Sequence, residues 1–279
     1  MPAPADLLLG LIGDNIAQSR APLLHRLAGM QTGLAVRYDL LVPADLGRDF
    51  DAVFDGCLAS GYRGINVTYP YKERVTARVA VSDPLVRAMG AVNTVLFGTA
   101  GPHGFNTDHT GFIAAYRAAR GNEPPGAVCL IGAGGVGRAI AFALAELGAS
   151  EIRLVDRDAA RSRALARDLA AVAGRTRIIE VPSAEEGAVQ ATGLVNGTPV
   201  GMAGDEGSPL RPEAMLGAAW AFDAVYTPSD TLFLSDAASA GAAVIPGWEL
   251  FFWQGVHAWA HFAGLALDEG RLRADLLDG

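Results

Sequence analysis

Short apolar runs alternate with amphipathic stretches along most of the chain. Strand-like runs at residues 7–13 and 36–42 are each followed by a stretch of helical period, the first beginning near Pro22 and the second covering residues 45–60. Strands that alternate with helices are typical of a parallel sheet, because a crossover between parallel neighbours usually contains a helix. The pattern therefore predicts an α/β fold with a mostly parallel sheet.

A second series of strands and helices follows the first. Two strand-like runs joined by a glycine-rich turn end near Asp108, and a Gly- and Pro-rich run at residues 121–126 marks a linker-like break before the next strand. The length of 279 residues exceeds what one ordinary core supports. We expect two domains, one over residues 1–108 that is completed by C-terminal helices at 248–279, and one over residues 109–247.

Composition argues against some classes of partner. The formal net charge of −8 disfavours binding to nucleic acid or to an anionic membrane, because both depend on a basic surface. No apolar run is long enough to cross a bilayer, and the N-terminal MPAPAD carries no basic leader. We expect a cytoplasmic protein, a monomer or a homodimer, whose partner is a small molecule.

Cysteine and histidine spacing does not favour a metal site. Cys57 and Cys129 lie in separate apolar segments, which is typical of buried, reduced thiols. His257 and His261 are one helical turn apart, but no acidic residue lies between them as in a zinc hydrolase helix. We therefore expect no metal.

The segment GAGGVG at residues 132–137 matches the pattern G-x-G-x-x-G in an informative context. It follows a strand and opens an apolar helix, and the next strand ends in Asp156, close to the spacing of about 20 residues in the dinucleotide fingerprint. Glycine lets a pyrophosphate approach the backbone, and free amides at the helix N-terminus favour its charge. The pattern predicts a dinucleotide site at Gly132, Gly134, Gly135, Val136 and Gly137.

The acidic residue after the second strand indicates which dinucleotide binds. Asp156 can accept hydrogen bonds from both hydroxyls of an adenosine ribose, but it repels a 2′-phosphate, and Asp158 adds to that repulsion. Arg157 acts in the opposite direction, because arginine can stack on adenine or reach a phosphate. We expect NAD, with NADP the less favoured cofactor.

Polar residues recur at strand ends and turns, mostly in the first half of the chain. Strand ends are where open α/β sheets bind ligands. The set comprises Ser19, Asn66, Thr68, Lys72, Asn93, Asn106, Asp108 and, late in the chain, Gln254. Taken singly, Lys72 is equally compatible with a solvated helix start, and Asp108 with a helix cap.

Together, these motifs resemble those of the shikimate and quinate dehydrogenase family, in the same order. The matching segments are SRAP, GINVTYPYK, GAVNT, NTD, GAGGVGRA, NGTPVGM and DAVY. The similarity spans nearly the whole chain, and NVTxPxK, GAVNT and NTD are its most specific parts. It implies a Rossmann-type NAD(P)-binding domain at residues 109–247, a substrate-binding domain formed by 1–108 with 248–279, and a cleft between them.

The resemblance also implies an activity. The family transfers a hydride reversibly between nicotinamide and a ring hydroxyl of a cyclic polyol carboxylate, shikimate or quinate, within the shikimate pathway of aromatic amino acid biosynthesis. By the same resemblance Lys72 and Asp108 form the catalytic pair, although the residues alone do not decide which of them moves the proton. The implied substrate contacts are Ser19, Asn66, Thr68, Asn93, Tyr226 and Gln254, and Gly247 and Arg157 join the cofactor site.

Two segments depart from the family pattern. Ala21 stands where the family usually carries a second hydroxyl that holds the substrate carboxylate, so one donor is missing unless Arg20 replaces it. Leu250 stands where the family commonly has methionine and Trp248 where it has a smaller residue, so the bulky Trp248 and the acidic Glu249 near the nicotinamide end can reshape the pocket. Two alternatives therefore stay open: a catalytically silent binding protein with this fold, and a methylene-tetrahydrofolate-type dehydrogenase of the same architecture, which NVTxPxK and NTD disfavour.

Overall fold

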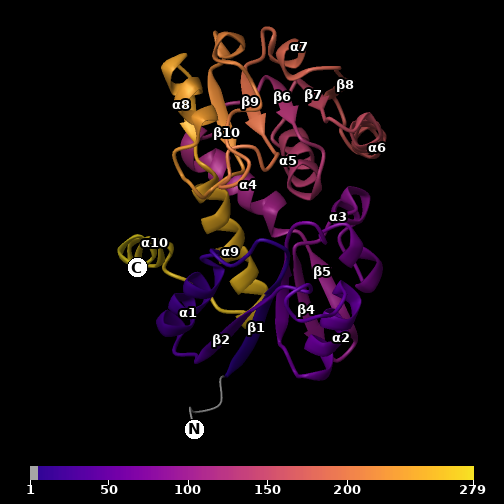
Figure 1. Ribbon diagram of the computed structural model, residues 1–279, viewed down its shortest axis with the longest axis vertical. Coiled ribbons are helices and arrows are strands. Elements are labelled where there is room, and N and C mark those ends of the chain that lie inside the picture. Colours follow the sequence, from indigo (N-terminus) through magenta and orange to yellow (C-terminus); the bar gives the residue numbers. More distant parts are fainter. Residues whose placement is uncertain (1–5) are drawn as a thin grey trace. The chain divides into compact units, whose positions relative to one another are not determined.

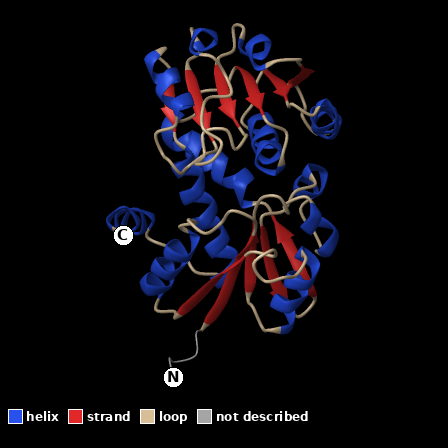
Figure 2. Cartoon of the chain, in the orientation of Figure 1, coloured by secondary structure: helices blue, strands red, loops and turns tan. Residues whose placement is uncertain are grey.

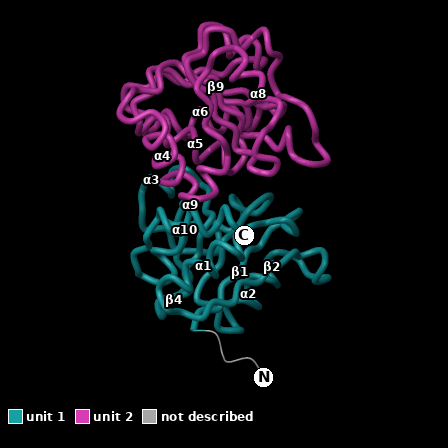
Figure 3. The backbone as a smooth tube through the Cα atoms, turned by 90° about the vertical axis from the view of Figure 1, so that its left-hand side faces the viewer, with its two compact units in different colours: residues 1–107, 254–279 teal, residues 108–253 magenta. Residues whose placement is uncertain are grey.

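The computed structural model describes residues 6–279, which form two compact units (Figure 3). Unit 1 contains residues 6–107 and 254–279, and unit 2 contains residues 108–253. Residues 1–5 lie outside the described part. They include most of the MPAPAD segment, on which the expectation of no basic leader rests. No helix in residues 6–279 has the length and apolar character needed to span a membrane.

In the described part of unit 1, five strands form one sheet (Figure 1). Across the sheet they are β2 (Val36–Leu41), β1 (Leu7–Ile12), β3 (Gly64–Val67), β4 (Thr94–Gly98) and β5 (Gly101–Phe105). β1 is parallel to β2 and to β3, whereas β4 is antiparallel to β3 and to β5. The glycine turn between β4 and β5 is too short for a crossover, so these two strands pair as the predicted hairpin.

The helices of unit 1 begin and end at local signals in the sequence. They are α1 (Ala21–Thr32), α2 (Phe50–Ala59), the 3-10 helix η1 (Arg74–Arg78), α3 (Pro84–Met89) and α10 (Glu269–Asp278). α1 has a proline in its first turn and ends at Gly33, whose φ is 75°. α2 starts later than the pattern predicts, because Asp49 caps it by accepting a hydrogen bond from the amide of Ala52 at 2.8 Å.

Unit 2 contains a sheet of six strands within the described residues, and every neighbouring pair is parallel. Across the sheet they are β11 (Ala243–Ile245), β10 (Trp220–Asp223), β9 (Gly193–Asn196), β6 (Ala127–Ile131), β7 (Glu151–Val155) and β8 (Arg177–Glu180). The chain order reverses where β6 and β9 lie side by side. In open α/β sheets, ligands bind at the carboxyl ends of the strands at such a reversal.

Helices flank this sheet on both faces (Figure 2). They are α4 (Thr107–Arg120), α5 (Gly135–Glu146), α6 (Ala159–Ala170), α7 (Ala184–Ala188), the 3-10 helix η2 (Pro212–Met215) and α8 (Leu232–Ser239). The following helix α9 (Gly247–Ala263) begins in unit 2 and continues into unit 1. Coverage on both faces explains why β6, β9 and β10 consist almost entirely of buried residues.

The Gly- and Pro-rich run at residues 121–126 is a loop inside unit 2 and does not separate the units. The helix before it, α4, contributes to the core of unit 2 through Phe112, which packs edge-on against Phe222 of β10 at 4.9 Å between ring centroids. Tyr116 packs in the same way on Trp220 at 5.1 Å. The apolar contacts of α4 therefore place this helix in unit 2, although the run that follows it has the composition of a linker. The predicted α/β fold with mostly parallel sheets is confirmed.

Candidate active site

The glycine-rich segment forms the turn between β6 and α5. Gly132 has a φ of 101°, a conformation that residues with side chains rarely adopt. A Cβ atom on Gly137 would lie 2.0 Å from the carbonyl oxygen of Gly132, so the turn and the helix approach closely only because residue 137 is glycine. At Gly134, by contrast, an added Cβ would meet only Nη1 of Arg161 within 4.0 Å, which leaves room for a ligand at the start of α5.

Asp156 connects this turn to the next one. Its Oδ2 accepts a hydrogen bond from the amide of Ala133 at 2.7 Å, and its Oδ1 accepts one from the amide of Asp158 at 2.8 Å. The carboxylate is therefore held beside the glycine turn at the end of β7. Asp158 has a separate task as the N-cap of α6, because its side chain accepts from the amide of Ala160 at 2.9 Å.

Arg161 is a residue that the sequence analysis missed. Its guanidinium lies beside the open face of Gly134, so it supplies a positive charge at the helix start to which the pattern assigns a pyrophosphate. The predicted Arg157 is exposed at the turn before α6. Arg161 lies in the first turn of α6, whereas Arg157 precedes that helix, so no spacing in the sequence pointed to Arg161.

A buried carboxylate organises the carboxyl ends of β9 and β10. Asp223 accepts hydrogen bonds from Asn196 Nδ2 at 2.9 Å, from the amide of Val225 at 2.9 Å and from Thr231 Oγ1 at 2.6 Å. Burial raises the pKa of Asp223 to about 6, and these hydrogen bonds oppose that shift. Asn196 in turn accepts from the amide of Thr198 at 2.9 Å, so one network fixes both loops.

The later predicted cofactor and substrate residues of unit 2 lie after β10 and at the start of α9. A Cβ atom on Gly247 would lie 2.4 Å from the carbonyl oxygen of Val225, so the α9 start packs directly on the loop that contains Tyr226. The Tyr226 ring stacks on the Phe251 ring with 4.8 Å between centroids, and Trp248 packs on the Phe251 ring with 5.3 Å between centroids. The departing residue Trp248 thus belongs to an aromatic cluster with Tyr226.

In unit 1, Lys72 follows β3 and is held by its backbone. Its carbonyl oxygen accepts hydrogen bonds from the amide of Val92 at 2.8 Å and from Thr76 Oγ1 at 3.3 Å. The preceding Tyr71 donates to Asp14 Oδ1 at 3.0 Å and stacks on Phe50 at 4.8 Å. The segment before η1 is therefore anchored on both sides, which gives Lys72 a defined position.

Four more predicted residues lie in or next to β3, β4 and β5. Asn66 and Asn93 are buried within unit 1 and share a network of hydrogen bonds. Thr68 donates its backbone amide to Ile12 at 2.9 Å. Asn106 donates its side-chain amide to the carbonyl of Ala91 at 2.9 Å, so it holds the loop before β4.

Asp108 is the second residue of α4 and is buried, with 5% of its surface exposed. The helix begins one residue earlier, at Thr107, so Asp108 lies inside the first turn and not at the cap position. An acidic side chain in the first turn is favoured by the helix dipole. The next residue, His109, has Nε2 3.3 Å from Glu146 Oε2 at the end of α5.

Ser19 and Arg20 lie just before α1, and Ala21, which departs from the family pattern, is the first residue of that helix. The Ser19 hydroxyl accepts a hydrogen bond from the amide of Ala21 at 3.3 Å, and the Ala21 methyl group is buried. Arg20, considered above as a replacement donor, donates to the carbonyl oxygen of Leu276 on α10. The structure thus engages Arg20 with the C-terminal helix.

The histidines of α9 pack in unit 1. His261 stacks on Phe105 at 3.8 Å, and burial lowers the pKa of His261 and of His257. Burial also raises the pKa of Cys57 and of Cys129 to about 12, so both remain thiols. In residues 6–279 no three potential metal ligands lie close enough together to hold an ion.

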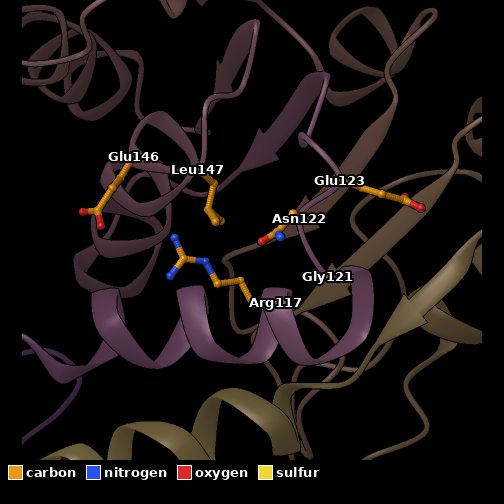
Figure 4. A pocket seen from close by; sticks show the side chains of 6 residues that line it. All are labelled: Arg117, Gly121, Asn122, Glu123, Glu146 and Leu147. Carbon is orange, nitrogen blue, oxygen red and sulfur yellow. The ribbon is translucent and has the colours of Figure 1, made fainter.

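A surface hollow lies elsewhere in unit 2, between the end of α4 and the end of α5 (Figure 4). Its lining residues are Arg117, Gly121, Asn122, Glu123, Glu146 and Leu147. Figure 4 shows the Arg117 side chain extending from α4 toward the Glu146 and Leu147 end of α5. No predicted site residue lines this hollow, and we assign it no part in the chemistry.

The fold and the site define a class. A parallel sheet with a glycine turn after β6, a helix N-terminus open at Gly134 and an acid after β7 forms a Rossmann-type dinucleotide-binding unit. The other unit presents a lysine, a threonine and several carboxamides at strand ends. This combination is typical of a nicotinamide-dependent oxidoreductase that acts on a polar substrate.

Comparisons with known proteins agree with this class. Residues 11–95 match the model of the shikimate dehydrogenase substrate binding domain. The chain is 35% identical to quinate/shikimate dehydrogenase (NAD(+)) of Corynebacterium efficiens, with 97% of this chain and 98% of the relative covered. It is 38% identical to shikimate dehydrogenase (NADP(+)) of Halobacterium salinarum, with coverages of 96% and 97%.

A solved structure extends the similarity to the whole fold. Quinate dehydrogenase from Corynebacterium glutamicum in complex with NAD superposes with a TM-score of 0.89 at 33% identity, covering 98% of this chain and 99% of that one. The chain belongs to the shikimate and quinate dehydrogenase family. The resemblance drawn from the motifs is confirmed, and the methylene-tetrahydrofolate-type alternative falls away.

Proposed function

We propose that the chain is an NAD-preferring dehydrogenase that oxidises a ring hydroxyl of shikimate, quinate or a close relative and reduces the corresponding ring ketone in the reverse direction. The relatives named above carry these activities, and one of them was solved with NAD. The proposal places the protein in the shikimate pathway. It also makes a small ring carboxylate its partner, and we propose a monomer or homodimer in the cytoplasm.

The observation that carries the proposal is the identity of residue 72. The sequence has 22 lysine and arginine residues, and Lys72 is its only lysine. Arginine serves wherever a fixed positive charge is enough, but its guanidinium does not lose a proton in proteins. A lysine kept at this single position supports a role that needs a compact ammonium group able to give up and regain a proton.

The residues of unit 2 fit a bound NAD. The amides at the start of α5 and the guanidinium of Arg161 suit a pyrophosphate, and Asp156 suits ribose hydroxyls. The predicted glycine contacts, with Arg157 and Gly247, complete this proposed site. NAD, when bound, supplies the acceptor for the hydride that leaves the carbinol carbon.

Residues of unit 1, together with Asp108 and Tyr226 of unit 2, would orient the substrate and accept its proton. We assign Ser19, Asn66, Thr68, Asn93 and Gln254, with Tyr226 of unit 2, to the hydroxyl and carboxylate groups of the ring acid. As the carbon loses its hydride, the hydroxyl must lose a proton to Lys72 Nζ or the Asp108 carboxylate, and we treat these two as one acid–base pair. Accordingly, substrate binding is assigned to residues 1–108 with 248–279, and cofactor binding to 109–247.

The test is a spectrophotometric screen of shikimate, quinate and related ring acids with NAD and NADP. We expect formation of reduced nicotinamide with at least one ring acid, faster with NAD than with NADP. Ala21 supplies no hydroxyl, so we expect a higher KM for a carboxylate substrate in this protein than in its Ala21→Ser variant. Binding of a ring acid without turnover under any condition would identify instead a silent family member.

A further inference from the structure

A chain of hydrogen-bonded side chains crosses the buried part of unit 1. Tyr38 Oη donates to Asn66 Oδ1 at 2.9 Å, Asn66 Nδ2 donates to Thr94 Oγ1 at 3.0 Å, and Thr94 Oγ1 donates to Asn93 Oδ1 at 3.1 Å. These residues come from β2, β3, β4 and the residue just before β4, and each is at most 7% exposed. Buried polar side chains lower the stability of a fold unless they form hydrogen bonds, and each side chain of this network forms at least one.

The network fixes which way the Asn66 carboxamide points. Asn66 Nδ2 lies 3.3 Å from the backbone carbonyl oxygen of Asn93, and a carbonyl oxygen can only accept. The nitrogen must therefore face β4 and the oxygen must face Tyr38. In the same network Tyr38 is itself held, because its ring stacks on the buried His25 at 4.9 Å with 7° between the planes.

The other end of the network is the first residue of α4. Asn93 Oδ1 accepts from the Thr107 amide at 2.7 Å, and Asn93 Nδ2 donates to Thr107 Oγ1 at 3.0 Å. Thr107 Oγ1 also lies 3.1 Å from Thr94 Oγ1. Because Asp108 follows Thr107 in the first turn, the network determines where the helix that carries this carboxylate begins.

We propose that Tyr38, Thr94 and Thr107 are positioning residues for catalysis, acting through Asn66 and Asn93 on substrate orientation and through the start of α4 on Asp108. The role of Asn66, Asn93 and Asp108 rests on the proposed function. Thr94 and Thr107 lie in the GAVNT and NTD motifs, but the sequence assigned no role to either of them or to Tyr38. The sequence pattern places Tyr38 in an apolar strand, and its hydrogen-bond partner Asn66 is 28 positions away in the chain.

The matched pair Tyr38→Phe and Tyr62→Phe tests this proposal. Both variants delete one phenol hydroxyl from unit 1, but Tyr62 donates to Asp39 Oδ2 at 2.6 Å, outside the network. We expect Tyr38→Phe to lower kcat/KM per folded molecule about tenfold, because Asn66 loses the donor that orients its oxygen. Tyr62→Phe should keep wild-type kcat/KM, with a melting temperature that falls as much as or more than that of Tyr38→Phe.

A second pair separates positioning from folding. Thr94→Ser keeps the hydroxyl and should restore kcat/KM to near the wild-type value, whereas Thr94→Val has the same shape without it and should lose about tenfold or more. If the Tyr38→Phe and Thr94→Val proteins, once folded, match wild type in kcat and KM, the proposal is wrong and the network serves stability alone.

An NMR measurement distinguishes failure of this proposal from failure of the proposed function. The side-chain amide signal of Asn66, identified by its loss in Asn66→Asp, should shift in Tyr38→Phe together with the Thr107 backbone amide, and neither should shift in Tyr62→Phe. A wild-type protein without turnover would overturn the proposed function, and with it the positioning role. Unchanged Asn66 and Thr107 signals in Tyr38→Phe would overturn the network while leaving the proposed function intact.

Discussion

At the residue scale, the proposed function depends most on the side chain of Lys72. The backbone carbonyl of Lys72 is held by Val92 in the loop before β4 and by Thr76 of η1, and its neighbour Tyr71 is anchored to Asp14 and Phe50. Such support from neighbouring segments suits the catalytic role proposed for Lys72, because small misplacements of a catalytic group reduce rates strongly. The preference for arginine everywhere else makes the lysine at this position informative.

Lys72→Ala and Lys72→Arg should each lower kcat by about 10²- to 10⁴-fold, the usual range for a lost acid–base group. Arginine retains the charge but does not release a proton, so it should not rescue activity. Steady-state kinetics with the preferred ring acid measures both variants, with Arg26→Ala on the exposed side of α1 as the control for a lost positive charge. Full activity of Lys72→Arg would show that the residue acts by charge alone.

Asp223 leads to a prediction for pH and stability. Its folded pKa of about 6 lies above the ordinary value of 3.8, so the folded state holds the proton more tightly than the unfolded state. The contribution of this group to stability is therefore fully present below about pH 4 and is lost as pH rises through about 6, with a magnitude on the order of 2–3 kcal/mol.

Replacing this carboxylate should remove that part of the pH dependence. The free energy of unfolding of Asp223→Asn minus that of wild type should rise by about 2 kcal/mol between pH 4.5 and pH 8, because only wild type loses this stabilisation as pH increases. Chemical denaturation at several pH values measures the difference. Asp230→Asn, at an exposed position in the same loop, should show no such trend, and equal slopes for the two variants would contradict the assignment to Asp223.

At the scale of elements, the turn between β7 and α6 separates two acidic residues with different tasks. Asp156 holds the glycine turn and faces the predicted ribose site, whereas Asp158 caps α6. A sequence pattern counts both as negative charge near the adenosine. The structure assigns the cap to one and the glycine turn to the other, because only Asp156 reaches the amide of Ala133.

Asp156→Asn should lower kcat/KM for NAD by about tenfold and narrow the preference over NADP, since a neutral amide no longer repels a 2′-phosphate. Asp158→Asn is the matched control, because asparagine caps a helix as well as aspartate does. Asp158→Asn should change the ratio of kcat/KM for NAD to kcat/KM for NADP much less than Asp156→Asn does. Kinetics with both cofactors provides the measurement, supported by direct titration of NAD binding; a larger effect of Asp158→Asn would reverse the assignment.

Much of the candidate site was predictable at the element scale. The glycine turn, Asp156 and the Lys72 segment each occupy one short stretch of sequence with a recognisable order of residue types. Arg161, Asp223 and Tyr38 were not predicted, because their partners lie on other elements. The Asn196 and Asp223 pair, for example, is 27 positions apart and joins two neighbouring strands.

At the scale of the whole molecule, α4 belongs to the core of unit 2 although it follows directly on the strands of unit 1. Its Phe112 contacts Phe222, and both are fully buried. The helix start is nevertheless held by Asn93 of unit 1. The first residue of α4 is therefore held by hydrogen bonds within unit 1, and its later residues pack in the core of unit 2. Asp108 lies between these two parts of the helix.

Phe222→Ala should destabilise unit 2 by about 3–5 kcal/mol and accelerate hydrogen exchange in α4 together with the surrounding strands. Phe54→Ala removes a buried ring of the same size from unit 1 and should leave exchange in α4 near the wild-type rate. Hydrogen exchange followed by mass spectrometry reports both units in one experiment. Faster exchange of α4 in Phe54→Ala alone would place this helix with unit 1.

The sequence by itself determined the α/β class, the dinucleotide turn, the acid that favours NAD and the family, because these depend on residue order within short segments and on the alternation of strand and helix. Only the tertiary structure decided that α4 packs with unit 2, that Arg161 lies beside Gly134, and that Tyr38 orients Asn66. These features arise from contacts between segments distant in the chain. A hydrogen bond requires two groups to meet at about 3 Å in the right direction, and no pattern along one segment specifies that meeting.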